Sequence, residues 1–99
     1  MKIPGKINIS GMEYEVIIKD QPLFCGNTRA YGHIDFDSKQ ILIDNTLRDS
    51  QGHMQTLLHE IIHGITNDRD IDFTQQGEET IVDQLAKGLY QVLKDNKIF

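Results

Sequence analysis

Residues 56–66 have the sequence TLLHEIIHGIT, in which two histidines lie four positions apart and a glutamate follows the first. Residues four apart lie on one face of an α-helix, with Cβ atoms about 5–6 Å apart, so both imidazoles can bind the same ion. Apolar residues recur with helical periodicity from about Ser50 to Thr66, and Asp49 or Ser50 can cap this helix. The stretch therefore predicts an amphipathic helix that contains a metal site.

The two histidines and the apolar residues lie on opposite sides of this helix. His59 and His63 share one side, and Glu60 lies next to them. In the pattern HExxH, the carboxylate of the second residue reaches a metal-activated water without binding the metal itself. His53 lies six residues before His59, off the face of the histidine pair, and we predict that it lies on the surface. The apolar side, which we expect to face the core, consists of Met54, Leu57, Leu58, Ile61, Ile62 and Ile65.

A zinc ion that keeps one position open for water needs a third protein ligand. The form HExxHxxGxxH is excluded, because Thr66 and Arg69 replace its glycine and its last histidine. A second helix, predicted from about Glu78 to Lys94, offers Glu79 in its first turn, where the helix dipole favours a carboxylate. Glu79 is therefore the preferred third ligand, and Glu78 is the alternative.

The second helix is also amphipathic, and Glu79, Asp83, Ala86 and Tyr90 share one face beside its apolar stripe. Ala86 is small enough to let the two helices approach closely. Asp83, one turn after Glu79, can accept a hydrogen bond from the N–H of a ligand histidine, although a solvated charge is an equal alternative. The predicted core face consists of Ile81, Leu85, Leu89, Val92 and Leu93.

The first half of the chain has the pattern of strands and turns. KINIS and EYEVIIK alternate polar and apolar residues on either side of Gly11, which predicts a hairpin. DQPLFCGNT is predicted to be a loop. RAYGHIDF and QILID form a second pair of strands, and QILID is expected to offer an edge to an extended substrate. Two helices against a small, mainly antiparallel sheet make an α+β fold, a single domain over residues 1–99.

Composition restricts the class of protein. The net charge is −5 and the basic residues are scattered, which argues against nucleic acid as a partner. Cys25 is the single cysteine, so no internal disulfide forms, and we predict that it is a half-buried small apolar residue. No stretch has the length and hydropathy of a signal peptide or a membrane span, so we expect no membrane association and a cytoplasmic location.

The motif HEIIH, followed sixteen residues after its second histidine by ETIVDQLA, resembles the ImmA/IrrE family of bacterial and phage-associated zinc metallopeptidases. In that family HExxH precedes a helix of the form E-x-x-A-(N/D)-x-F-A. Glu79 matches the glutamate, Asp83 the Asn/Asp and Ala86 the closing alanine, whereas Val82 and Leu85 depart from the pattern. The resemblance extends over about residues 32–93.

The resemblance implies a minimal zincin-like fold and a gluzincin-like zinc endopeptidase, with His59, His63 and Glu79 as ligands. Members of the family typically act in the cytoplasm on a transcriptional repressor, often that of a prophage or mobile element. The chain ends shortly after the second helix, where the family often continues. We therefore expect substrate recognition to differ, or a partner protein to supply it.

The expected chemistry is hydrolysis of a peptide bond, with Glu60 as the general base that takes a proton from a metal-activated water. Tyr90, His33 and Tyr31 are candidate donors to the oxyanion, although each also suits a structural role. Two alternatives to the peptidase stay open. One is a non-enzymatic zinc site that only holds the two helices together, and the other is a degenerate interaction module that has lost its metal.

Overall fold

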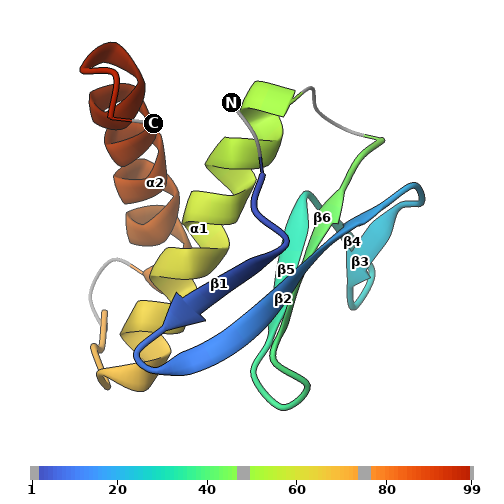
Figure 1. Cartoon of the computed structure of the whole chain (residues 1–99). Helices are drawn as coiled ribbons and strands as arrows, with labels where there is room; N and C mark the ends of the chain where they lie inside the picture. The colour runs from blue at the N-terminus through green and yellow to red at the C-terminus, as the bar shows by residue number, and fades with distance from the viewer. Residues whose placement is uncertain (1–2, 47–49, 74–76, 99) are drawn as a thin grey trace.

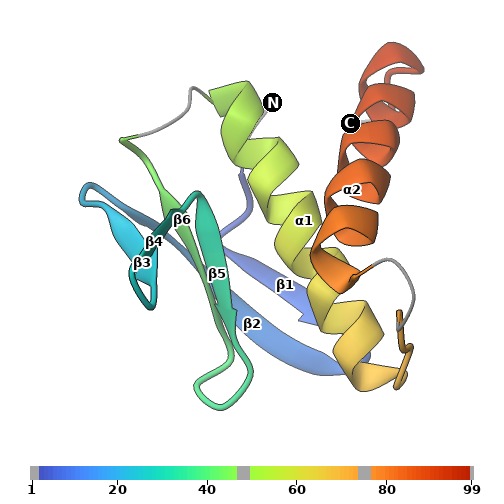
Figure 2. The same cartoon turned by 180° about the vertical axis from the view of Figure 1, so that it is seen from behind.

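The computed structural model describes residues 3–46, 50–73 and 77–98. Within these residues, a four-stranded sheet, α1 (Ser50–Asp68) and α2 (Glu78–Asp95) form three successive layers, with α1 in the middle (Figures 1 and 2). This arrangement confirms the predicted α+β class. Neither helix in this part of the chain has the length and hydropathy that a membrane crossing requires.

The sheet consists of two antiparallel hairpins joined side by side. The hairpin of β1 and β2 turns at Ser10 and Gly11, which both have positive φ (53° and 85°). The hairpin of β5 and β6 turns over residues 36–39, so the predicted pairing of RAYGHIDF with QILID is confirmed for residues 32–35. The strand order is β1-β2-β6-β5. The bounds are β1 (Lys6–Ile9), β2 (Met12–Lys19), β5 (Gly32–Asp35) and β6 (Gln40–Asp44).

The two hairpins meet through a parallel pairing of β2 with β6, which places Val16 opposite Ile41 and Ile18 opposite Ile43. The sheet is therefore mixed, although antiparallel pairs predominate. This pairing also makes β6 an interior strand, so the prediction that QILID offers a free edge is wrong. Parallel partners need a long connection between them, and local alternation does not reveal such a partner. The edge on this side of the sheet is β5.

A second, smaller sheet begins in the segment that we predicted as a loop and extends through Ala30 into RAYGHIDF, which we predicted as one strand. Only Gly32–Asp35 of RAYGHIDF belongs to the main sheet. β3 (Leu23–Cys25) and β4 (Thr28–Ala30) form a separate antiparallel hairpin that turns at Gly26, whose φ is 64°. Each strand has only three residues, and most of them are exposed. Strands this short and exposed show no alternation that a pattern can detect.

α1 is covered on both of its long sides. Toward the sheet, Leu57 is 1% exposed and packs in one core with Ile41 and Ile43, which are fully buried. The helix lies so close to the strands that a Cβ at Gly64 would be 2.9 Å from Ile9 Cδ1. The remaining buried members of this core cluster are Ile9, Tyr14, Val16, Ile34, Met54, Leu58, Ala86 and Tyr90.

Two positions on α1 differ from the prediction. His53 is 7% exposed and therefore buried, although we predicted a surface position. Ile65, predicted near the centre of the apolar stripe, is 37% exposed. The buried surface of α1 extends well beyond the apolar stripe, and it includes polar residues such as Thr56, which lies against Gly32 of β5. The predicted cap at Asp49 or Ser50 depends on side chains outside the described part.

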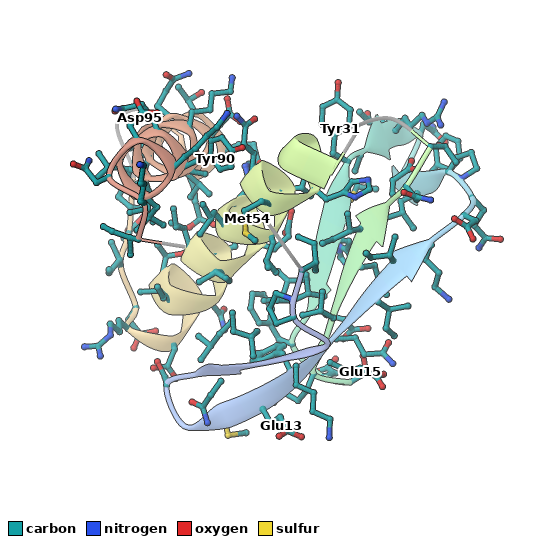
Figure 3. The ribbon with its side chains drawn as sticks, turned by 45° about the horizontal axis from the view of Figure 1, so that its top comes forward. Glu13, Glu15, Tyr31, Met54, Tyr90 and Asp95 are labelled. Carbon is teal, nitrogen blue, oxygen red and sulfur yellow. The ribbon has the colours of Figure 1, made fainter. Side chains whose placement is uncertain are left out.

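The face of α2 that packs on α1 is not the predicted one. Val82, Ala86 and Tyr90 are the buried residues of this helix, and Figure 3 shows Tyr90 on the side toward α1. In contrast, Leu85 is 53% exposed, and Ile81 and Leu93 are partly buried at the margins. The small side chain of Ala86 permits the close approach of the two helices that we expected. The face of α2 that carries Ala86 is, however, the face that packs on α1. Leu89 and Val92 are likewise exposed, at 41% and 45%.

The orientation of α2 predicts unequal effects of one substitution at two sites. We expect Val82→Ala to lower the free energy of unfolding by about 2 kcal/mol, because it removes two buried carbon atoms and leaves a cavity. Val92→Ala, on the same helix, should change it by less than about 0.5 kcal/mol. Urea unfolding at low micromolar protein concentration measures both. Equal losses at the two sites would contradict the observed orientation.

Candidate metal centre

Three side chains from the two helices bring their ligand atoms together. His59 and His63 lie one turn apart on α1, with 3.2 Å between their Nε2 atoms. Glu79, in the first turn of α2, places Oε1 2.5 Å from His59 Nε2 and Oε2 3.1 Å from His63 Nε2. The packing of Val82 and Ala86 against α1 fixes the start of α2 at this point.

These separations fit a metal ion. Ligands on a tetrahedral ion with bonds of about 2.0–2.1 Å lie about 3.3 Å from one another. The ligand atoms of His59, His63 and Glu79 all lie within 4.8 Å of one another, as one ion requires. Two imidazoles and a carboxylate suit Zn²⁺, and the same donors also accept other divalent ions of the first transition row. The group can therefore hold a metal ion, and its identity is open.

Glu78 and Asp83 lie behind the two histidines. With Nε2 turned to the group, His63 Nδ1 carries the proton and donates to Glu78 Oε2 over 2.8 Å. Glu78, the alternative third ligand, therefore contacts the far side of the ring. Asp83 Oδ1 is 3.7 Å from His59 Nδ1, and Asp83 Oδ2 forms an ion pair with Lys87 at 2.9 Å.

The carboxylates around His63 change its pKa. Burial alone would lower that pKa, but the hydrogen bond that His63 donates to Glu78 and the charge and hydrogen bonding of Glu79 outweigh this effect and raise it. Metal ions bind the neutral imidazole. A proton therefore competes with a metal ion for His63, and we expect metal affinity to increase as the pH rises.

Glu60 is buried beside the metal group, with 6% of its surface exposed. Burial raises its pKa to about 7, and the charge of Glu79 adds to this increase while His63 opposes it. The carboxylate lies against the backbone of β5, where a Cβ at Gly32 would be 3.2 Å from Glu60 Oε2. Glu60 is thus close to the group and changes protonation near neutral pH.

An open cleft of about 1220 Å³ borders the metal group. It lies between the β3–β4 hairpin and β5 on one side and α1 and the start of α2 on the other. Figures 2 and 3 show this hairpin on the side of β5 away from α1. Polar side chains line much of the cleft, among them those of His59, Glu60, His63, Glu79, Tyr31 and His33.

The hairpin is fixed to the sheet through Asp44, which is 1% exposed at the end of β6. Burial would raise the pKa of Asp44, but hydrogen bonds from the hydroxyl and amide of Thr46 and the amide of Leu23, with the charge of Arg29, lower it. Arg29 lies on β4 and also donates to Thr46 Oγ1 over 2.7 Å. One buried carboxylate therefore connects both strands of the hairpin to β6.

The predicted oxyanion donors occupy different places. His33 and Tyr31 line the cleft, and Tyr31 is 46% exposed. Tyr90 does not line it, because this side chain is 6% exposed within the core between the helices. Cys25 was predicted to be half-buried but is exposed, with Sγ 3.9 Å from His33 Nδ1. No sequence pattern predicted that Cys25 and His33 lie together, because the β3–β4 hairpin that positions Cys25 was not predicted.

The buried Glu60 predicts an unusual pH dependence of stability. Between 4.5 and about 7 the folded chain retains a proton on Glu60 that the unfolded chain has released. The free energy of unfolding of the metal-free protein should therefore fall by about 3 kcal/mol as the pH rises through this window. The raised pKa of His63 acts in the same direction, because its contribution is present below 6.5 and is lost as the pH rises.

Urea unfolding with a chelator, from pH 5 to pH 8, measures this dependence. Glu60→Gln should remove most of it, whereas Glu15→Gln, at an exposed position on β2, should retain it. A wild-type protein equally stable at both ends of the range would refute the assignment of a protonated, buried Glu60.

Comparisons of the chain with models of protein families, with curated proteins and with solved structures found no match. The assignment of a function therefore depends on the metal-binding group, on the buried Glu60 beside it and on the cleft that both line.

Proposed function

We propose that this protein is a zinc-dependent endopeptidase with a minimal zincin-like domain of the ImmA/IrrE type. One observation supports the proposal most strongly. His59, His63 and Glu79 converge at distances suited to one ion, and the buried Glu60 lies beside them in the wall of the same open cleft. Peptide hydrolysis at a metal needs this combination of ligands, a base that is not a ligand, and access for the substrate.

Each residue of the group has a distinct role in this proposal. His59, His63 and Glu79 hold the zinc ion, and Glu78 keeps the His63 ring turned so that Nε2 faces it. When bound, zinc acts as a Lewis acid that makes water more acidic and polarises a carbonyl group. Three protein ligands leave one coordination position for that chemistry, as catalytic sites require and structural sites do not.

Glu60 serves as the general base. A carboxylate with a pKa of about 7 accepts a proton from the attacking water and later delivers it to the leaving amine. Burying a carboxyl group lowers the stability of the fold. A site that only holds two helices together has no use for such a group. Glu60 therefore supports the enzyme over the structural alternative.

An extended peptide is the proposed substrate, bound along β5. This strand is at the end of the sheet order and lies between the cleft and β6. An edge strand binds a peptide by backbone hydrogen bonds, and His33 and Tyr31, on and beside β5, are candidate donors to the oxyanion. The resemblance to ImmA/IrrE suggests a regulatory protein such as a repressor as the natural substrate.

Zinc binding tests the ligand assignment. We expect the wild-type protein to bind one zinc ion tightly and Glu79→Ala to bind it at least about 100-fold more weakly. Glu78→Ala should weaken binding by about 10- to 100-fold, because it removes only the partner of a ligand. Glu15→Ala is the control and should bind as the wild type does. Titration against a chromophoric chelator measures all four, and binding indifferent to Glu79 would exclude this centre.

Hydrolysis tests the role of Glu60. Glu60→Gln should retain zinc but lose about 10²- to 10⁴-fold in the rate of peptide cleavage. Incubation with a diverse peptide library, followed by mass spectrometry, detects cleavage without a known substrate. Turnover by the glutamine variant would show that Glu60 is not the base. A zinc-loaded wild type that cleaves nothing in the library would favour the non-enzymatic site.

A further inference from the structure

β5 meets α1 at a contact that leaves no room for a side chain at Gly32. A Cβ at this position would be 2.5 Å from Thr56 Cγ2, 3.1 Å from the carbonyl oxygen of Leu42 and 3.2 Å from Glu60 Oε2. Non-bonded carbon atoms pack at about 3.5–4.0 Å. Thr56 is 5% exposed and Glu60 is 6% exposed, so neither side chain lies free in solvent. The absence of a side chain at Gly32 therefore makes this close contact possible.

The alternation of β5 brings Gly32 level with Glu60 on α1. Successive residues of a strand face opposite sides of the sheet. Gly32 and Ile34 face α1, whereas His33 faces the other way and contacts the β3–β4 hairpin. Ile34 lies against Gly64, which is one turn after Glu60 on α1. Of the two β5 residues that face the helix, the one that lies against the carboxylate is thus the one without a side chain.

We propose that Gly32 is a positioning residue of the proposed catalytic centre, and that the space left by its missing side chain holds the Glu60 carboxylate in the wall of the cleft. The inference rests on the proposed function, in which Glu60 is the general base. A base must lie within hydrogen-bond distance of the proton that it accepts. A small displacement of Glu60 therefore lowers the rate of hydrolysis, even when the fold and the metal ligands are retained.

The backbone of Gly32 lies at the open edge of the sheet. The amide of Asp44 donates to the carbonyl oxygen of Tyr31, and these two residues form the pair next to Gly32 and Ile43 in the register of β5 with β6. Antiparallel partners exchange hydrogen bonds at every second pair. The N–H and C=O of Gly32 therefore point away from β6. Because alanine has the same backbone groups, Gly32→Ala moves Glu60 without removing a backbone partner of the proposed substrate.

Thr56 allows the contact with Glu60 to be separated from close packing alone. The methyl group that Gly32→Ala introduces overlaps most with the methyl group of Thr56, and less with the Glu60 carboxylate and the Leu42 carbonyl oxygen. Serine at position 56 lacks that methyl group and retains the hydroxyl. The double variant Gly32→Ala/Thr56→Ser therefore relieves the largest overlap and leaves the one with Glu60.

Hydrolysis of the peptide that the wild type cleaves fastest in the library is the first measurement. Gly32→Ala should lower the midpoint of urea unfolding, and the added Thr56→Ser should restore it. The zinc-loaded double variant should still have a kcat about 10-fold below that of the wild type, with KM and zinc affinity unchanged. A double variant with the kcat of the wild type would overturn the proposal.

Two single variants are the controls. Thr56→Ser should cleave the peptide as the wild type does, because it introduces no group beside Glu60. Gly88→Ala makes the same substitution on α2, where a Cβ meets no atom within 4 Å, and it should also leave kcat unchanged. An equal loss of kcat in either control would show that Gly32 has no specific role.

A second measurement does not need turnover. In the zinc-loaded protein, the ¹³C NMR signal of the Glu60 side-chain carboxyl group reports on its surroundings, and its loss in Glu60→Gln identifies it. The signal should shift in the double variant relative to Thr56→Ser alone, and Gly88→Ala should leave it in place. A signal indifferent to Gly32→Ala would exclude the positioning role. A wild type that cleaves no peptide would instead contradict the proposed function, so the two failures are distinguishable.

Discussion

The burial of α1 on both of its long sides determines most of this structure. The sheet covers one side through Leu57 and the closely packed Gly64, so the other side needs a second layer. α2 provides it, and the small side chain of Ala86 lets the helices approach until the first turn of α2 reaches the histidines of α1. The position of the metal group is thus a consequence of core packing, with Glu79 placed by residues that have no polar function.

In the metal-free state, carboxylates and imidazoles of the group lie close together without a cation between them. Four carboxylates, from Glu60, Glu78, Glu79 and Asp83, lie around two imidazoles at the margin of the core. Burial, with a smaller contribution from the charge of Glu79, raises the pKa of Glu60, and the carboxylates of Glu78 and Glu79 raise the pKa of His63. In the absence of a cation, the group therefore retains protons. A divalent cation would replace those protons, so its binding is expected to release them to solvent.

Local patterns were sufficient for part of this description. Helical spacing identified His59 and His63, and the angular positions of residues on the second helix selected Glu79. The structure brings the ligand atoms of all three residues together. The parallel pairing of β2 with β6 was not predictable, because it joins segments far apart in the chain. The predicted orientation of α2 was wrong for a different reason. Hydrophobicity alone favoured the face of Leu85 for the core, whereas close packing on α1 selected Val82.

The place of Glu79 at the very start of α2 has a thermodynamic consequence. The residue before this helix is Gly77, and none of the described side chains caps its first turn. Helix ends open more readily than helix interiors. In the proposed centre, ion affinity and the docking of α2 on α1 are therefore linked reciprocally, each strengthening the other by the same factor. A substitution deep in the interface, far from any ligand atom, would change how tightly the protein retains its ion.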